Sequence, residues 1–368
     1  FTMIDQATLQ ALVGFQSTHK AAPTLSLYLD VDPRRRTTDE YRLALRHLLS
    51  TVDGQASKED SARIERFIEK EYDRQSRSLV CFSCAAEDFW HAIPLAAPVA
   101  DTIFVGQRAY IKPLGDLLDT FARYGVVLVD REGGHLFMFN LGQLEGVSGV
   151  AGEDVKRHKQ GGWASARWQR QEDQAAYRNL KEVVEMTSQF VQSGAVRRLI
   201  LGGTEANVAQ FAAMLPKSVQ SMVAGAINAD VTASPAEVGE KSLALIQQAA
   251  AVHKAQLVDQ LITTAAKGGP AALGLANTLL AVDARRARHL VLDESFAAPA
   301  YRCDSCGYVG VEPMEENACP LCAAQLRLLP DAADSLVRWS VEQEIDVTFV
   351  AGSAALRDAG FIGALLRY

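Results

Sequence analysis

Four cysteines near the end of the chain have types and spacing that suit a metal ion. They form two Cys-x-x-Cys pairs separated by twelve residues, namely Cys303 with Cys306 and Cys319 with Cys322. Each pair turns two thiolates to one side, so two pairs complete a closed tetrahedral shell around Zn²⁺. Gly307 and Pro320 suit the tight turns that such pairs need. Because a full shell leaves no position for water, we predict a structural zinc site within residues 301–325.

A second segment with chemical potential lies in the middle of the chain, between Asp154 and Arg170. It combines positive charge, aromatic side chains and a Gly-Gly pair in a chain whose net charge is -7. Basic residues contact phosphate and aromatic rings stack on bases, so this composition is typical of RNA binding. The candidate RNA-binding residues are Lys156, Arg157, His158, Lys159, Gly161, Gly162, Trp163, Arg167 and Arg170. The alternative is a flexible surface loop whose charges only aid solubility.

A third Cys-x-x-Cys pair, Cys81 with Cys84, has a different interpretation. Both cysteines lie in the apolar run from Ser78 to Cys84, which is typical of a strand. Side chains three positions apart in a strand point to opposite faces, and no third ligand is nearby in the sequence. We therefore predict two buried thiols without a metal ion.

Length and composition limit the classes of protein that this chain can be. A chain of 368 residues is too long for one typical core, so two or three domains are expected. The acidic balance argues against a surface that grips nucleic acid all over, but it is compatible with local basic patches. No apolar run is long enough to cross a membrane and no signal pattern opens the chain. We therefore expect a cytoplasmic protein with reduced cysteines that does not bind membranes.

The hydrophobic pattern predicts the strands and helices that hold these segments. In the first region we expect strands at 24–31, 78–84 and 89–95 and helices at 39–51 and 58–72. In the second we expect strands at 124–130, 133–139, 197–203 and 221–227 and helices at 171–193, 207–215 and 235–266. After a linker signal at 267–270 we expect helices at 273–283 and 332–343 and strands at 289–293 and 346–350. This order implies α/β layers with a mixed sheet, and it places the paired cysteines between a strand and a helix.

The chain resembles the archaeal and eukaryotic class I peptide chain release factors and their relative Pelota. The segment from Gly274 to Ser295 is similar to the start of the third domain of that superfamily, and the ending Ile362-Gly-Ala-Leu-Leu-Arg-Tyr368 is similar to the end of that domain. The paired cysteines resemble the zinc knuckle of archaeal members, and the basic segment falls where release factors carry Gly-Gly-Gln. By this resemblance the chain is identified as a member of the divergent, Balon-like branch of bacteria and some archaea.

The resemblance implies an α/β fold with three domains in a tRNA-shaped molecule. An α+β N-terminal domain, residues 1–118, would enter the decoding centre of the ribosome. An RNase H-like middle domain, residues 119–268, would send its basic Gly-Gly loop toward the peptidyl-transferase centre. A small α/β C-terminal domain, residues 269–368, would hold the zinc-ribbon insert and contact a translational GTPase such as elongation factor Tu.

Two departures from the family pattern bear on function. Release factors place Gln after Gly-Gly, where it helps to position water at the ester of peptidyl-tRNA, whereas this chain has Trp163. Trp has one indole donor and no oxygen acceptor, so it cannot replace that Gln. Residues 1–115 also contain no string that resembles the Asn-Ile-Lys-Ser tip that reads stop codons. Both departures argue against ordinary termination.

Three functional hypotheses follow from these features. The favoured one is a monomeric, non-enzymatic factor that occupies the A site of hibernating or stalled ribosomes, binds rRNA there and reads no stop codon. The second is a peptidyl-tRNA hydrolase in ribosome rescue or peptide release, with water placed by Gly161, Gly162 and either Gln160 or Gln169. The third is a zinc-stabilised scaffold that binds another RNA or protein.

Overall fold

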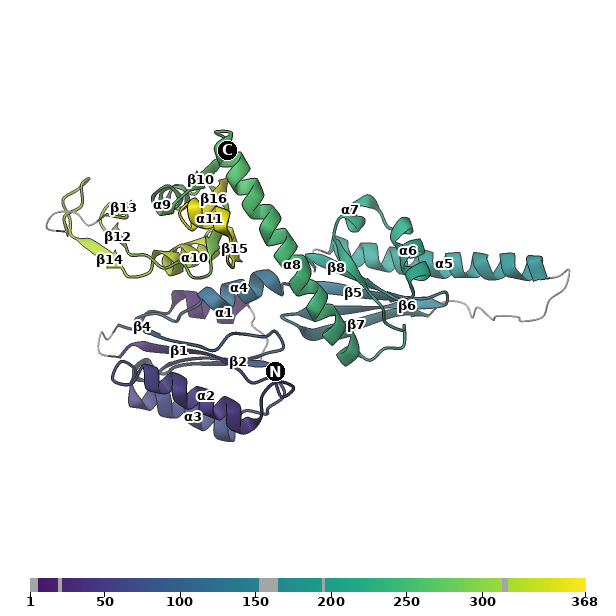
Figure 1. The fold of residues 1–368 in the computed structure, drawn as a ribbon, viewed down its shortest axis with the longest axis horizontal. Helices are drawn as coiled ribbons and strands as arrows, with labels where there is room; N and C mark the ends of the chain where they lie inside the picture. The colour runs from purple at the N-terminus through teal and green to yellow at the C-terminus, as the bar shows by residue number, and fades with distance from the viewer. Residues whose placement is uncertain (1–5, 19–21, 152–164, 194–195, 313–316) are drawn as a thin grey trace. The chain divides into compact units, whose positions relative to one another are not determined.

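The computed structural model describes residues 6–18, 22–151, 165–193, 196–312 and 317–368. The chain divides into two compact units (Figure 1). Unit 1 contains Phe1–Asp119 together with Ala251–Tyr368, and unit 2 contains Thr120–Ala250. The two ends of the chain therefore fold into the same unit. Among the described residues, we find no helix with the length and apolar character needed to span a membrane.

The first part of unit 1 is built on an antiparallel sheet with the strand order β3-β2-β1-β4. Its strands are β1 (Thr24–Asp30), β2 (Ser78–Cys84), β3 (Phe89–Leu95) and β4 (Thr102–Gly106). The accompanying helices are α1 (Gln6–Gly14), α2 (Thr38–Thr51), α3 (Lys58–Lys70) and α4 (Lys112–Thr120), and a 3-10 turn covers Ala85–Glu87. The strands and helices predicted for this region are confirmed to within two residues, and α1, β4 and α4 are additions to them.

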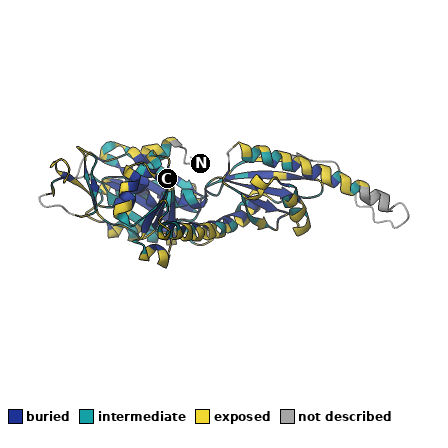
Figure 2. Ribbon diagram, turned by 90° about the horizontal axis from the view of Figure 1, so that it is seen from above, coloured by how far each residue is buried: buried dark blue, intermediate teal, exposed yellow. Residues whose placement is uncertain are grey.

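Helices cover both faces of this sheet, so even the polar residues of its two central strands are buried. Every residue of β1 and β2 is buried, although both strands carry Ser side chains. Apolar side chains of α2 and α3 pack against one face, including Leu45 and Ile64. In Figure 2 exposed residues lie on the outer faces of helices. On the face of the sheet opposite α2 and α3 lie α1 and α4 (Figure 1). There the hydroxyl of Ser26 accepts a 2.9 Å hydrogen bond from the backbone N–H of Tyr110, which compensates for its burial.

Unit 2 contains a five-stranded mixed sheet with the order β7-β6-β5-β8-β9. The strands are β5 (Tyr124–Val129), β6 (Gly133–Asn140), β7 (Gln143–Ala151), β8 (Arg198–Gly202) and β9 (Val223–Ile227). Strands β5, β6 and β7 run antiparallel, whereas β8 and β9 are parallel to β5. The helices are α5 (Ser165–Gln192), α6 (Glu205–Met214), α7 (Lys217–Gln220) and α8 (Pro235–Ala266), which continues into unit 1. The mixed sheet is confirmed.

The last part of unit 1 is a second α/β layer. Its sheet has the order β10-β16-β11-β15, with β10 (Ala271–Leu273), β11 (Ala287–Asp293), β15 (Asp346–Val350) and β16 (Ile362–Leu366). Its helices are α9 (Leu275–Asp283), α10 (Ala332–Glu342) and α11 (Ala354–Asp358). A small sheet of β12 (Ala300–Cys303), β13 (Val309–Gly310) and β14 (Leu326–Leu329) lies between β11 and α10 in the chain. The cysteine pairs are therefore inserted between a strand and a helix, as predicted.

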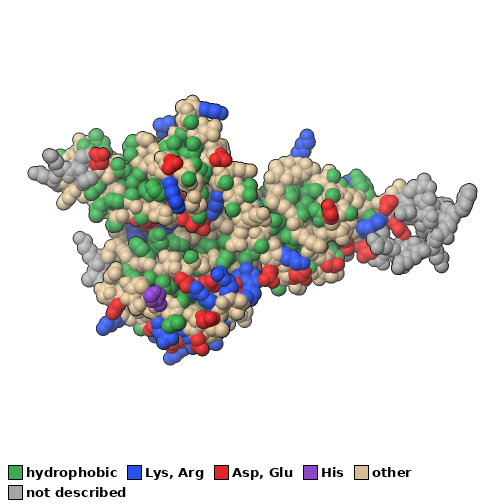
Figure 3. Space-filling model, in the orientation of Figure 1, with side chains coloured by type: hydrophobic (Ala, Val, Ile, Leu, Met, Phe, Trp, Pro, Cys, Tyr) green, Lys and Arg blue, Asp and Glu red, His purple; other side chains and the backbone are tan. Residues whose placement is uncertain are grey.

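Charged side chains of both signs are spread over the described surface that Figure 3 shows. Lys and Arg side chains lie among Asp and Glu there, and they form no single broad basic face in that view (Figure 3). This distribution agrees with the acidic balance of the chain. On this face, only local clusters of basic residues could bind phosphate strongly.

Candidate metal centre and other functional residues

The four predicted ligands meet at one point of the small sheet. The Sγ atoms of Cys303, Cys306, Cys319 and Cys322 all lie within 4.8 Å of one another. The Sγ atoms of Cys303 and Cys322 are 3.5 Å apart, and so are those of Cys306 and Cys319. A tetrahedral zinc site with Zn–S bonds near 2.3 Å requires sulfur separations of about 3.8 Å. The thiol set therefore fits a tetrahedral thiophilic metal ion with little rearrangement.

The first cysteine pair is shaped by a tight turn of its backbone. The N–H of Cys303 donates to the carbonyl of Tyr308 at 2.8 Å, and the N–H of Gly307 donates to the carbonyl of Cys303 at 2.9 Å. Gly307 has a φ of 81°, a left-handed conformation that glycine adopts without strain. Hydrogen bonding from the backbone N–H of Cys306 lowers the pKa of Cys303 to about 6, which favours the thiolate that a metal ion binds.

The second pair repeats this turn with an alanine in the place of the glycine. The N–H of Cys319 donates to the carbonyl of Ala324 at 2.8 Å, and the N–H of Ala323 donates to the carbonyl of Cys319 at 2.9 Å. Ala323 has a φ of 57°. An alanine pays a steric penalty in this region. Its presence shows that the surrounding contacts hold the turn in the form that brings the thiols together.

The basic segment lies mostly outside the described residues. The residues concerned are Lys156, Arg157, His158, Lys159, Gln160, Gly161, Gly162 and Trp163. The remaining three candidates, Arg167, Gln169 and Arg170, belong to the first two turns of α5, and only their backbone is described. The strand β7 leads into this segment and α5 leaves it. Its role in RNA binding or hydrolysis stays a prediction.

The third cysteine pair is confirmed as two buried thiols. Cys81 and Cys84 both lie in β2 and are fully buried. Burial raises the pKa of both thiols. They are absent from the only cluster of three or more metal-binding side chains found among the described residues. These thiols therefore serve packing.

Two buried cations that the sequence analysis did not single out join the first and last parts of unit 1. Arg338 of α10 is 2% exposed and donates to the carbonyls of Leu12 (3.2 Å), Val13 (2.8 Å) and Ala109. Its Nε donates to Asp334 at 2.8 Å. Lys112 is 4% exposed. No sequence signal marks either residue, because their partners lie far away in the chain.

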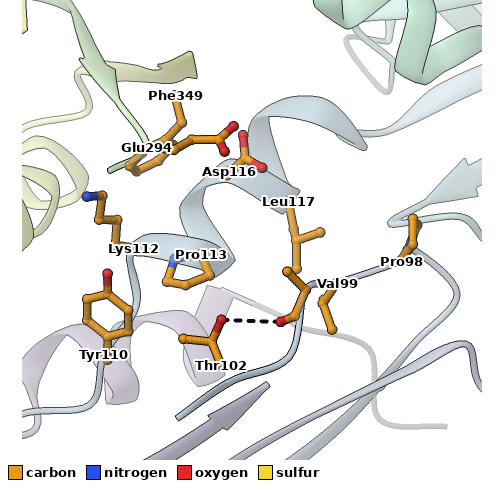
Figure 4. A pocket seen from close by; sticks show the side chains of 11 residues that line it. Pro98, Val99, Thr102, Tyr110, Lys112, Pro113, Asp116, Leu117, Glu294 and Phe349 are labelled. Atoms are coloured by element: carbon orange, nitrogen blue, oxygen red, sulfur yellow. Dashed lines mark hydrogen bonds between the residues drawn. The ribbon is translucent and has the colours of Figure 1, made fainter. Parts of the chain in front are cut away.

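A pocket of about 270 Å³ opens beside Lys112 (Figure 4). Pro113 and Phe349 provide apolar wall, whereas Asp116 and Glu294 provide carboxylates. Desolvation raises the pKa of Glu294, and the nearby Asp116 adds to this shift. Asp116 forms a 2.7 Å ion pair with Lys254 of α8, so its charge is compensated within unit 1. The pocket is another feature that sequence reasoning missed.

Part of the chain is similar to known release factors. Residues 110–247 match the model of "Bacterial archaeo-eukaryotic release factor family 10". A stretch of 209 residues is 23% identical to peptide chain release factor subunit 1 of Archaeoglobus fulgidus. Residues 110–247 are thus similar to the bacterial archaeo-eukaryotic release factors. The resemblance to release factors drawn from the sequence is thereby confirmed.

The sequence match and the structural matches cover different shares of the chain. The sequence match to the Archaeoglobus fulgidus release factor covers 55% of this chain and 51% of that protein. The chain therefore spans about half the length of that protein. The crystal structure of the archaeal translation termination factor aRF1 is 16% identical, with 98% of this chain and 96% of that chain covered and a TM-score of 0.28. Archaeoglobus fulgidus Pelota is 15% identical, with 81% of each chain covered and a TM-score of 0.35.

Proposed function

We propose that this release-factor relative is a ribosome-binding translation factor that occupies the A site during hibernation or stalling and reads no stop codon. The observation that carries the proposal is the family match over residues 110–247, because it includes the whole basic segment and the sheet of unit 2. The local concentration of basic and aromatic residues supports a contact with rRNA. The cytoplasm is the compartment in which such a factor would act, as a monomer.

The proposed architecture has three functional parts. Residues 1–118 would enter the decoding centre, residues 119–268 would form the RNase H-like middle domain, and residues 269–368 would form the C-terminal domain. The strand order of unit 2 supports the middle assignment. In chain order it is 3-2-1-4-5, with three antiparallel strands followed by two parallel ones, which is the arrangement of an RNase H-like sheet.

The zinc site would act as a structural staple of the C-terminal part. Its four thiols fill a tetrahedral shell, so a bound zinc ion would hold β12, β13 and β14 together and would have no place for a reactive water. Because the small sheet has few apolar contacts of its own, metal binding would contribute to its folding. A translational GTPase such as elongation factor Tu is the proposed partner of this part.

The basic segment would bind rRNA rather than catalyse the hydrolysis of peptidyl-tRNA. Trp163 follows Gly161-Gly162 where release factors have Gln, and an indole ring stacks on bases but cannot orient water through an oxygen acceptor. Gln160 and Gln169 are the side chains that a hydrolytic mechanism would need in its place. The two mechanisms therefore depend on different residues, and substitution separates them.

Co-sedimentation with vacant ribosomes, together with a peptidyl-tRNA hydrolysis assay, tests the proposal. Wild-type protein should sediment with ribosomes and release no peptide, and Trp163→Ala should weaken binding by about tenfold, the loss of one stacked base. The matched control is Tyr177→Ala, an exposed aromatic residue of α5 at 53% exposure, which should bind like wild type. Failure of the wild-type protein to sediment would overturn the proposal. If the wild-type protein releases peptide, and Gln160→Ala or Gln169→Ala abolishes that release, the protein is instead a peptidyl-tRNA hydrolase.

A further inference from the structure

Three consecutive arginines form the connection between β1 and α2. We call Arg34, Arg35 and Arg36 the arginine turn; they are the longest uninterrupted run of Lys and Arg in the sequence. The backbone N–H groups of Arg35 and Arg36 each donate to the carbonyl of Asp32 at 2.9 Å. The capping box of Thr37 then begins α2 directly. The backbone of the arginine turn is therefore fixed at both ends.

A buried carboxylate holds each of the first two guanidinium groups. Asp32 accepts the backbone N–H of Arg34 at 3.0 Å through Oδ1, and its Oδ2 lies 2.7 Å from Nη2 of Arg34. Asp30 accepts the backbone N–H of Asp32 at 3.1 Å, and its Oδ2 lies 3.2 Å from Nη1 of Arg35. Both aspartates are only 4% exposed. Each carboxylate thus accepts a backbone N–H through Oδ1 and lies beside an arginine through Oδ2, and Oδ1 of Asp32 also accepts from Nε of Arg34 at 2.9 Å.

The guanidinium group of Arg36 is held in the same way by Asp101, which directly precedes β4. Asp101 accepts the backbone N–H of Asp30 at 2.8 Å through Oδ1, and its Oδ2 lies 2.7 Å from Nη1 of Arg36. All three arginine side chains nevertheless reach solvent, with exposures of 44% for Arg34, 66% for Arg35 and 30% for Arg36. The arginine turn therefore presents three positioned guanidinium groups at the surface.

The ion pairs of the arginine turn compensate the buried carboxylates of Asp30 and Asp32. Ordering the long arginine side chains costs rotamer entropy, which is lost when the chain folds. A ligand that binds side chains already held in place avoids that entropic cost. Arg77 also lies 3.9 Å from Asp32, so four guanidinium groups gather around the carboxylates of this turn. The arrangement has the properties of a preorganised anion-binding surface.

We propose that the arginine turn binds the phosphate backbone of RNA. The planar guanidinium fork matches phosphate geometry, and three such groups along one turn suit the successive phosphates of a polynucleotide. A local cluster on an otherwise acidic chain also confines the contact to one place. The inference rests on the proposed function in naming RNA as the partner, and it adds a second contact far from residues 156–170 in the sequence. Its test uses RNA alone, so the two proposals fail separately.

The test measures binding of a labelled single-stranded RNA oligonucleotide to the full chain by fluorescence anisotropy at several salt concentrations. The variant Arg34→Gln/Arg35→Gln/Arg36→Gln should lose at least tenfold in affinity, and its slope of log K against log salt should fall by about 2 units. The variant with Lys at all three positions should keep most of the slope and still lose affinity. It retains the charges but not the guanidinium forks, so this result separates preorganised recognition from charge alone.

A matched control removes the same charge from neighbouring helices of the same part. Arg46→Gln/Arg66→Gln/Lys70→Gln changes exposed residues of α2 and α3 and should leave affinity and slope near wild type. The single change Arg35→Gln affects the most exposed arginine of the turn. It provides a second test of RNA binding if the triple variant does not fold. The inference is overturned if wild-type protein fails to bind RNA at low salt, if the arginine-turn variant binds like wild type, or if the control loses as much. Ribosome sedimentation has no bearing on these outcomes.

Discussion

The ammonium group of Lys112 donates a 2.6 Å hydrogen bond to the backbone carbonyl of Phe296, across 184 residues of sequence. Arg338 makes the reciprocal contact, because it lies in the last part of unit 1 and donates to carbonyls of the first part. Each part therefore buries a cation among the backbone acceptors of the other. These contacts explain physically why the ends of the chain form one unit.

Replacing Arg338 should destabilise unit 1 strongly. Arg338→Met would leave three buried carbonyls and the carboxylate of Asp334 without their donor, which we expect to lower the free energy of unfolding by about 3 kcal/mol. Urea unfolding followed by tryptophan fluorescence measures this loss. Arg327→Met removes an arginine that pairs with Asp304 at the surface, and it should cost about 1 kcal/mol or less. Equal losses in the two variants would contradict the role given to Arg338.

The buried ammonium of Lys112 predicts a pH dependence at alkaline pH. Desolvation lowers the pKa of Lys112 below its ordinary value of 10.5. Between the lowered value and 10.5, the unfolded chain binds more protons than the folded one, so this residue makes stability rise with pH. The stability of wild type relative to Lys112→Met should therefore increase as pH rises through that window. Urea unfolding at a series of alkaline pH values tests the sign, and a flat or falling difference would contradict it.

Loss of one metal-ligating thiol should remove the metal and loosen the small sheet. Cys322→Ser should purify with less than one equivalent of zinc and melt at a lower temperature than wild type, since binding and folding are coupled. Cys84→Ser is the matched control, because it changes a buried thiol outside the cluster and should keep its zinc. Elemental analysis and thermal melts provide both readouts. Wild-type protein without zinc, melting like Cys322→Ser, would refute the metal assignment.

The two cysteine turns should respond in opposite ways to exchange of Ala and Gly. Gly307→Ala places a side chain at a φ of 81° and should cost about 1 kcal/mol, although no neighbouring atom lies within 4 Å of the added methyl group. Ala323→Gly relieves the same strain at a φ of 57° and should not destabilise the protein. Thermal melts of the zinc-loaded variants compare the two. A larger loss for Ala323→Gly than for Gly307→Ala would contradict the shared turn geometry.

Some elements escaped the sequence analysis because their local signal is weak. The strand β7 carries Gly146 and Gly149, which dilute a strand pattern, and it is defined instead by pairing with β6. The start of α5 at Ser165 lies before the predicted 171, where Arg167, Trp168 and Arg170 hide helical periodicity. By contrast α8 begins at Pro235 and ends at Ala266, as its entry proline and the following Gly268 predicted.

The sequence by itself determined features that depend on neighbours in the chain: most of the strands and helices, the paired cysteines and the resemblance to release factors. Short spacing and hydrophobic periodicity encode these features directly. Only the tertiary structure decided the partners of Lys112 and Arg338 and the carboxylate of Asp101 that directs Arg36. Those contacts join residues far apart in the chain. Their energy comes from burial and hydrogen bonding that exist only after the chain has folded.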